Sequence, residues 1–221
     1  MLAAARVNLM RNHKMALDLA VQALSILREV GDKKLEASTL SVMCQAHFLL
    51  SEPQAALTDA NASLELHETM DDLTGKAEVL HWSARALQAT GKSEDAIQRA
   101  KRAVDIFRKT GKRRLEASEL HSVAEWYMEL GQTRKALPIA EQAVAICRQG
   151  AFGHWEAHAL STLCEALMAA KQPRRAWNAV EVAQGRFREK GEKKALAISC
   201  GVMRRIHLAQ DALDKAMETI E

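Results

Sequence analysis

Residues 35–74 of the 221-residue chain read LEASTLSVMCQAHFLLSEPQAALTDANASLELHETMDDLT. Apolar residues recur at helical spacing in the first part of this stretch, and the break Ser51-Glu52-Pro53 separates it from a second helical part. The second part places the small residues Ala56, Ala60 and Ser63 on one stripe of its helix. The stretch therefore predicts two helices joined by a tight turn, which is a helical hairpin of helix A followed by helix B.

The same pattern returns about every 40 residues along the chain, and a period of this length predicts a solenoid in which each unit buries its apolar face against its neighbours. We expect one continuous all-α array over residues 1–221, with a partial unit, four full units and a final unit whose helix B is cut short at Glu221. Because polar capping elements are missing, the array is expected to be a portion of a longer array or protein. The columns at this spacing are Ala16, Ala56, Ala96, Ala136, Ala176 and Ala216; Ala37, Ala77, Ala117, Ala157 and Ala197; Leu40, Leu80, Leu120 and Leu160; and Ala20, Ala60, Ala100, Ala140 and Val180.

The connections between the hairpins carry signals of their own. Glycine follows the expected end of helix B at Gly31, Gly111 and Gly191, where it predicts a left-handed C-cap. Pro138 lies early in an expected helix B, and its missing N–H predicts that this helix bends or begins late.

Composition narrows the class of protein. Hydrophobic residues make up 48% of the chain and aromatic residues only 4%, which favours closely packed helices over sheets. The net charge of +3 is too small to indicate a polyanion partner. No apolar run is long enough for a membrane span, and the N-terminus does not read as a secretory signal. The four irregularly spaced cysteines favour an intracellular reducing compartment, with the cytoplasm preferred and an organelle left open.

The hairpin resembles the tetratricopeptide repeat, whose three small positions are matched here by Cys44, Ala56 and Ser63 and by their counterparts in the next two units. The longer period resembles the repeats of Pins-type adaptors and of some peptide-sensing bacterial regulators. The resemblance implies a right-handed superhelical α-solenoid of antiparallel helical hairpins, with about five to six repeats including the partial terminal ones, whose concave face lies along the A helices. Leucines occupy the position where the family commonly has tryptophan, so the subfamily stays open.

Catalytic, metal and cofactor motifs are missing from the sequence. It has neither HExxH nor CxxC, and it has no glycine-rich phosphate loop. Cys164 and Cys200 fall in small or leucine columns, so both are expected in the core rather than as nucleophiles. We therefore expect a protein that is not an enzyme and that has no cofactor.

Two kinds of partner are disfavoured. The basic turns at Lys33-Lys34, Lys112-Arg113-Arg114 and Lys193-Lys194 alternate with acidic or neutral turns, so they are expected to be separate patches and not a nucleic-acid track. The carboxylate clamp of chaperone-binding tetratricopeptide domains needs Lys and Asn at helix A positions 5 and 9, and no unit has them. Those positions hold Ser41 and Gln45, His81 and Arg85, His121 and Glu125, Ser161 and Glu165, and Gly201 and Arg205.

The sequence thus predicts a non-catalytic scaffold, adaptor or assembly subunit that binds a helix or peptide in the concave groove. The alternatives are a sensor domain that controls an attached effector and an RNA-binding helical-repeat protein. Mixed charges and flexible methionines on the expected groove suit an amphipathic helix or extended peptide. The expected partner-binding residues are His81, Arg85, Gln88, His121, Glu125, Met128, Ser161, Glu165 and Met168.

Overall fold

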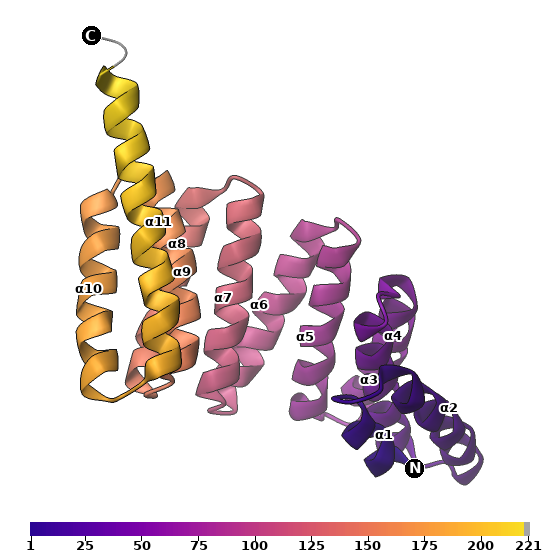
Figure 1. Ribbon diagram of the computed structural model, residues 1–221. Helices are drawn as coiled ribbons and strands as arrows, with labels where there is room; N and C mark the ends of the chain where they lie inside the picture. Colours follow the sequence, from indigo (N-terminus) through magenta and orange to yellow (C-terminus); the bar gives the residue numbers. More distant parts are fainter. Residues whose placement is uncertain (219–221) are drawn as a thin grey trace. The chain divides into compact units, whose positions relative to one another are not determined.

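A computed structural model describes the backbone of residues 1–218 and the side chains of residues 1–209. Within this part, the chain forms eleven helices and no strand, so the prediction of an all-α fold is confirmed (Figure 1). The helices are α1 (Leu2–Asn8), α2 (His13–Val30), α3 (Lys33–Leu49), α4 (Pro53–Thr69), α5 (Leu73–Ala89), α6 (Ser93–Lys109), α7 (Arg113–Glu129), α8 (Thr133–Gln149), α9 (Gly153–Ala169), α10 (Pro173–Glu189) and α11 (Lys193–Glu218).

The helices follow a spacing that is half the sequence period. Each of α3 to α10 has 17 residues, and a new helix begins at every twentieth residue from Lys33 to Lys193. One residue with a left-handed backbone stands in every connection after α2, at the same interval. Five of these residues are glycines and four are not: Gly31, Ser51, Asp71, Gly91, Gly111, Gly131, Ala151, Lys171 and Gly191.

The chain divides into two compact units, Met1–Gly111 and Lys112–Glu221. In the first unit the hairpins α3–α4 and α5–α6 stack through α3 and α5, and the short α1 packs on α2 and α3. In the second unit the hairpins α7–α8 and α9–α10 stack through α7 and α9, and α11 packs on α9 and α10. Odd-numbered helices from α3 onwards are thus the A helices, and even-numbered helices are the B helices.

The small-residue columns lie in the core, as predicted. Ala16, Ala56, Ala96, Ala136 and Ala176 are all fully buried, and the leucine column is at most 5% exposed. A larger side chain at one of these alanines would overpack a close contact between helices, a change that costs about 1–3 kcal/mol. The columns therefore fix the register in which each B helix lies against its neighbours.

The final repeat differs from the prediction. The helix α11 continues from Lys193 to Glu218, with no turn near residue 211 where a helix B was expected to begin. Residues 208–213 read LAQDAL and contain neither glycine nor proline, so nothing local ends the helix. The prediction that Cys200 lies in the core is wrong, because in the described residues no following helix covers that side of α11; Ala197 is exposed for the same reason. Ala216 and the expected helix end at Glu221 lie outside the described side chains.

The expectation for Pro138 is also wrong in part. The helix α8 begins at Thr133, in register with the other B helices. The N–H that proline lacks would have bonded to the carbonyl four residues earlier, which is Arg134 in the first turn. Only one bond near the helix start is lost, and the exposed Pro138 is accommodated without delaying the helix.

Candidate functional site

The nine residues predicted to bind a partner occupy equivalent positions on three A helices, and we call this set of positions the A-helix face. Each helix contributes a triplet with the same burial pattern, in which the middle residue is exposed and the outer two are half-buried. The first triplet belongs to the first unit, and the other two triplets belong to the second unit. The triplets are His81, Arg85 and Gln88 on α5; His121, Glu125 and Met128 on α7; and Ser161, Glu165 and Met168 on α9.

The α9 triplet borders a hollow of about 240 Å³ between α9 and α11. The sides of the hollow are mainly apolar, and α9 and α11 each contribute half of the lining residues. Sequence reasoning included the three α9 residues but left out the partners on α11. The lining residues are Ser161, Cys164, Glu165, Met168, Val202, Arg205, Ile206 and Ala209.

Charged side chains from two helices meet at one edge of this hollow. Arg205 Nη1 lies 2.5 Å from Glu165 Oε1, and Arg205 Nη2 also donates to Ser161 Oγ. Both charged side chains are half exposed, so their ion pair contributes little to stability and stays accessible to a partner. Burial raises the pKa of the neighbouring Cys164 to about 12, so this thiol stays protonated and is a poor nucleophile at neutral pH.

The α7 triplet is held by contacts within the second unit. His121 Nδ1 lies 3.2 Å from Thr162 Oγ1 on α9, and His121 Nε2 lies 3.6 Å from Glu125 Oε1. Burial lowers the pKa of His121 to about 4, and the nearby His158 acts in the same direction. The imidazole is therefore neutral at physiological pH and acts as a hydrogen-bonding group of the A-helix face.

The α5 triplet is supported by aromatic side chains that sequence reasoning did not place in the site. The Arg85 guanidinium lies 5.5 Å from the centroid of Phe48 on α3 and 6.0 Å from that of Trp82. The two rings are themselves 5.7 Å apart. This arrangement holds the Arg85 side chain against an aromatic surface through cation–π contacts. Phe48 could have been found from the sequence, since it stands one repeat before Gln88 in the same column.

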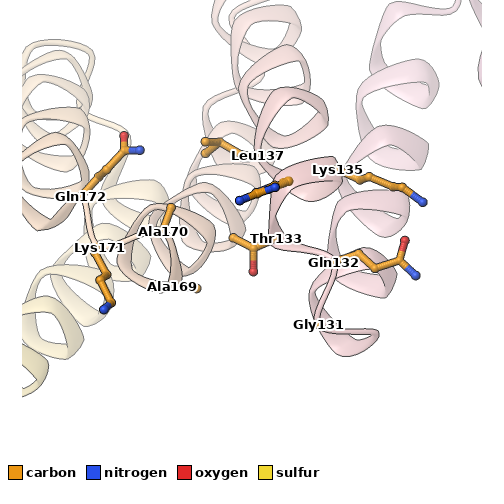
Figure 2. A pocket seen from close by; sticks show the side chains of 10 residues that line it. Gly131, Gln132, Thr133, Lys135, Leu137, Ala169, Ala170, Lys171 and Gln172 are labelled. Atoms are coloured by element: carbon orange, nitrogen blue, oxygen red, sulfur yellow. The ribbon is translucent and has the colours of Figure 1, made fainter.

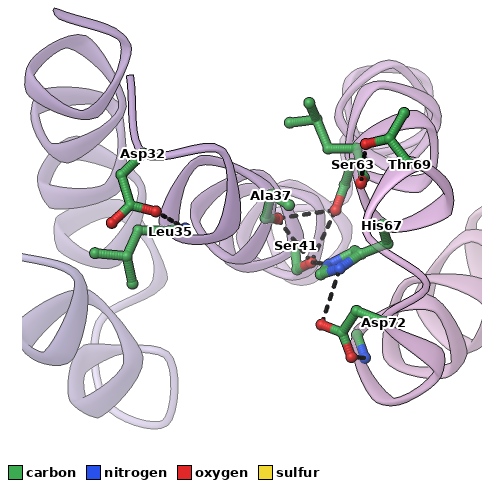
Figure 3. A network of polar contacts seen from close by, with 10 residues as sticks. Asp32, Leu35, Ala37, Ser41, Ser63, His67, Thr69 and Asp72 are labelled. Atoms are coloured by element: carbon green, nitrogen blue, oxygen red, sulfur yellow. Dashed lines mark hydrogen bonds and ion pairs between the residues drawn. The ribbon is translucent and has the colours of Figure 1, made fainter. Parts of the chain in front are cut away.

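A serine, a histidine and an aspartate also come together in the first unit (Figure 3). His67 lies between them, with Nε2 3.5 Å from Ser41 Oγ and Nδ1 3.1 Å from Asp72 Oδ2. Ser41 Oγ has two other hydrogen-bond partners. It can donate to the Ala37 carbonyl at 3.0 Å, and it lies 2.9 Å from Ser63 Oγ, where either hydroxyl can donate. His67 is only 1% exposed, so a substrate does not reach this arrangement. The grouping is a structural network that holds α3, α4 and the start of α5 together.

The His67 ring fits at its position because the neighbouring Gly75 has no side chain. A Cβ atom at Gly75 would lie 2.1 Å from His67 Cε1, so only glycine fits beside the ring. In the same pair of columns a large residue also faces a small one at Phe187 with Ala195 and at Cys147 with Trp155, but not at Leu27 with Leu35 or at Phe107 with Leu115. The size relation therefore holds at three of the five corners and is only a partial signal in the sequence.

A second missed pattern is an ion pair that recurs across the same corner. Arg28 Nε lies 3.1 Å from Glu36 Oε1, and the equivalent pair one repeat later has its charges exchanged, with Lys76 Nζ 2.8 Å from Glu68 Oε1. Glu36 is buried, and the hydrogen bond from Lys33 lowers the pKa of this carboxyl. Lys33, which the sequence placed in an exposed basic turn, therefore forms an ion pair with the buried carboxyl of Glu36.

The same holds for the basic turn of the second unit. Arg113 Nη1 lies 2.7 Å from Glu116 Oε2, and Glu116 is fully buried. The charge of Arg113 is thus neutralised by a buried acid, whereas Lys112 and Arg114 of the same turn are exposed.

Among the residues with described side chains, no group of three His, Cys, Asp or Glu is placed to hold a metal ion. In the same part of the chain, no helix has the length and apolar character of a membrane span.

Comparison with known proteins finds similarity to the tetratricopeptide repeat over part of the chain. Residues 75–149 match the family model of the tetratricopeptide repeat. Tetratricopeptide repeat protein 29 of Homo sapiens is 29% identical over 98 residues, which are 44% of this chain and 21% of that protein. The match with the same protein of Macaca fascicularis has 28% identity over the same length. The chain thus spans about a fifth of the length of these curated relatives.

Solved structures share the fold along nearly the whole chain. A Signal Transduction ATPase with Numerous Domains protein from Pyrococcus horikoshii, which has a tetratricopeptide repeat sensor, aligns with a TM-score of 0.79 and 17% identity over 99% of this chain and 34% of that one. A Rap protein complexed with Competence and Sporulation Factor aligns with a TM-score of 0.66 and 15% identity, over 97% of this chain and 64% of that one. At such identities the likeness shows the fold of a tetratricopeptide solenoid.

Proposed function

We propose that this chain, whose residues 75–149 match the tetratricopeptide repeat, is a non-catalytic interaction module that binds a helix or extended peptide of a protein partner. It acts as a scaffold, an adaptor or a subunit of a larger assembly. The partner lies on the A-helix face. The single observation that carries the proposal is the apolar hollow between α9 and α11, with its accessible ion pair at the edge.

The hollow has the size and lining of an anchor site. A volume of about 240 Å³ accommodates one large apolar side chain of a partner against Met168, Val202 and Ile206. Full burial of such a side chain contributes about 1.5–3 kcal/mol, and a few anchors of this kind carry most of the energy of an interface. Glu165 and Arg205 offer an acceptor and a donor at the edge, which suits the backbone or the polar side chains of a bound peptide.

A substitution inside the hollow tests the proposal. Crosslinking mass spectrometry after a pull-down identifies the partner, and isothermal titration calorimetry with the purified partner gives the affinity. We expect Met168→Glu to raise Kd at least tenfold, because it places an unpaired charge where the anchor is desolvated. The matched control is Val182→Glu on α10, which makes a similar change at an exposed residue. Equal losses in both variants, or no loss with Met168→Glu, would contradict the proposal.

The other two triplets are tested by charge reversal. Arg85→Glu and Glu125→Arg should each weaken binding by more than about 1 kcal/mol and leave the melting temperature nearly unchanged, because exposed charges contribute little to folding. The control pair is Lys112→Glu with Arg114→Glu, on exposed turn residues. Arg113 is unsuitable as a control, since it pairs with the buried Glu116. Loss of binding only in the control pair would place the partner on the turns instead.

The finer assignments follow the same argument. A sensor module that controls an attached effector is the second candidate, and it is supported by the tetratricopeptide repeat sensor among the proteins of the same fold. The long spacing of the repeat columns favours the longer repeats of Pins-type adaptors. An RNA-binding role has the least support, because two of the three charged residues on the A-helix face, Glu125 and Glu165, are acidic and would repel phosphates. Four cysteines, three of them buried free thiols, support a reducing compartment such as the cytoplasm.

A further inference from the structure

A second and larger hollow lies at the tips of two hairpins in the second unit. It has a volume of about 850 Å³ and is formed by the turn between α7 and α8 together with the turn between α9 and α10. Figure 2 shows the lining residues of both turns, with Thr133 and Leu137 from one turn and Lys171 and Gln172 from the other, and with the Lys135 side chain directed away from the second turn. None of its lining residues belongs to the A-helix face, so the two surfaces are separate.

The charges that line this hollow are all of one sign. Arg134 and Lys135 come from the first turn of α8, and Lys171 comes from the turn before α10. No acidic residue is among the described lining residues. All three cationic side chains are exposed, and the Lys135 ammonium lies 5.7 Å from the centroid of the Tyr127 ring. The hollow therefore presents three positive charges to solvent.

These positive charges lie at or near the N-terminal ends of helices, where they do not favour helix stability. The N-terminal end of a helix carries partial positive charge, so acidic residues are favoured in the first turn and basic residues are not. The helix α6 follows the rule with Glu94 and Asp95 in its first turn. Neither α8 nor α10 has an acidic residue there or a side-chain cap, which is also true of α4, and Arg134 stands in the first turn of α8. An anionic group bound at these helix starts would be attracted both by the basic side chains and by the partial positive charge of the helix ends.

We propose that this hollow docks an acidic peptide segment, a run of Asp or Glu residues in a protein partner. Several carboxylates along such a segment can meet Arg134 on one turn and Lys171 on the other at the same time, with Lys135 adding positive charge nearby. A single small anion is too small for a hollow of about 850 Å³. A single-stranded nucleic acid is less suited, because none of the described lining residues is aromatic and bases lack a stacking surface.

The test uses the full chain and a fluorescein-labelled peptide of eight glutamates, with binding followed by fluorescence anisotropy at low salt. The variant combines Arg134→Glu and Lys171→Asp. Glutamate in a first helical turn is favourable, and aspartate tolerates the left-handed backbone of Lys171, whose φ is 58°. We expect Kd for the peptide to rise at least tenfold while the melting temperature stays equal or rises. Loss of binding then cannot be attributed to unfolding.

The matched control combines Lys112→Asp and Arg114→Glu, which makes the same change of net charge on the exposed turn between helix B and helix A of the same unit. Its Kd should stay within twofold of the parent protein. An equal loss in the control would show that only net charge attracts the peptide and would overturn the site. Tighter binding of an oligouridylate of eight phosphates, lost in the Arg134 and Lys171 variant, would overturn the choice of a peptide in favour of nucleic acid. The outcome is independent of the Met168 test on the A-helix face.

Discussion

Gly131 and Gly185 lie in the same unit but differ in backbone conformation, so the substitution of alanine should change the free energy of unfolding in opposite directions. Gly131 has a φ of 68° in the turn before α8, whereas Gly185 lies inside α10. At both positions, a built Cβ would meet no other atom within 4 Å. The two substitutions therefore differ in backbone energy and not in packing.

The magnitudes follow from the two conformations. A left-handed backbone costs a residue with a Cβ atom about 1–2 kcal/mol. Alanine recovers about 0.4–1 kcal/mol by restricting the unfolded chain, so Gly131→Ala should destabilise by about 1 kcal/mol. Inside a helix, glycine is worse than alanine by about 0.5–1 kcal/mol, so Gly185→Ala should stabilise by that amount. The reverse change at Ala151, with a φ of 54°, should stabilise by up to about 1 kcal/mol when glycine replaces alanine.

Urea denaturation followed by circular dichroism at 222 nm measures all three variants under the same conditions. The midpoint should fall for Gly131→Ala and rise for Gly185→Ala and Ala151→Gly, with an unchanged m-value. Tryptophan fluorescence gives a second probe inside the unit, through Trp126, Trp155 and Trp177. Destabilisation by both glycine-to-alanine changes, or a neutral Gly131→Ala, would refute the assignment of a left-handed turn at every twentieth residue.

Three further predictions concern packing, pH and charge. Ala96→Leu should overpack a fully buried contact and cost about 1–3 kcal/mol, whereas Gln98→Leu on the exposed side of the same helix should cost little, as measured by thermal unfolding. The half-buried His121 has a folded pKa of about 4 against an ordinary pKa of 6.5, so the unfolded chain binds a proton first and stability falls as the pH drops from 6.5 towards 4. Between pH 7.5 and pH 5 this histidine should account for a loss of about 2 kcal/mol, which His121→Asn should remove, as measured by urea denaturation. Lys76→Glu should lower the melting temperature by placing two carboxylates at one corner. The added change Glu68→Arg should restore part of the loss, because the double variant regains the pairing of the preceding repeat but loses the contact of Glu68 with Arg102.

The hairpins and their register could be predicted because they depend on residue size. Alanine at Ala56, Ala96 and Ala136 is demanded by close contacts between helices, and such a demand repeats with the unit and is visible in one sequence. The 20-residue spacing of the turns, which is half the length of the hairpin unit, could not be predicted from columns of side chains. This spacing is defined by a left-handed backbone conformation, which residues such as Ala151 and Lys171 adopt in place of glycine. Five of the nine positions are glycines, which is a signal at the half-unit spacing that a search for columns of side chains passes over.

The candidate site was predicted only as far as single helices. Glu165 was predicted as a single residue of α9, and Arg205 was assigned to the same column one repeat later without the inference that opposite charges in adjacent repeats would pair. The neighbours of Arg85 were missed because Phe48 and Trp82 occupy different columns and meet only after the helices pack. A column describes what is equivalent between repeats, whereas a site is made of residues from different columns on neighbouring helices.

This distinction also explains which residues of the chain are free to serve a partner. Some charged residues form ion pairs between the end of one helix and the start of the next, as Arg28 does with Glu36 and Glu68 does with Lys76. These side chains stabilise the contact between the two helices. Arg134, in the first turn of α8, is exposed and takes no part in such a pair among the described side chains. In a repeat protein the fold is built from what the units share, so the residues in which one unit departs from the others are where recognition of a particular partner is to be sought.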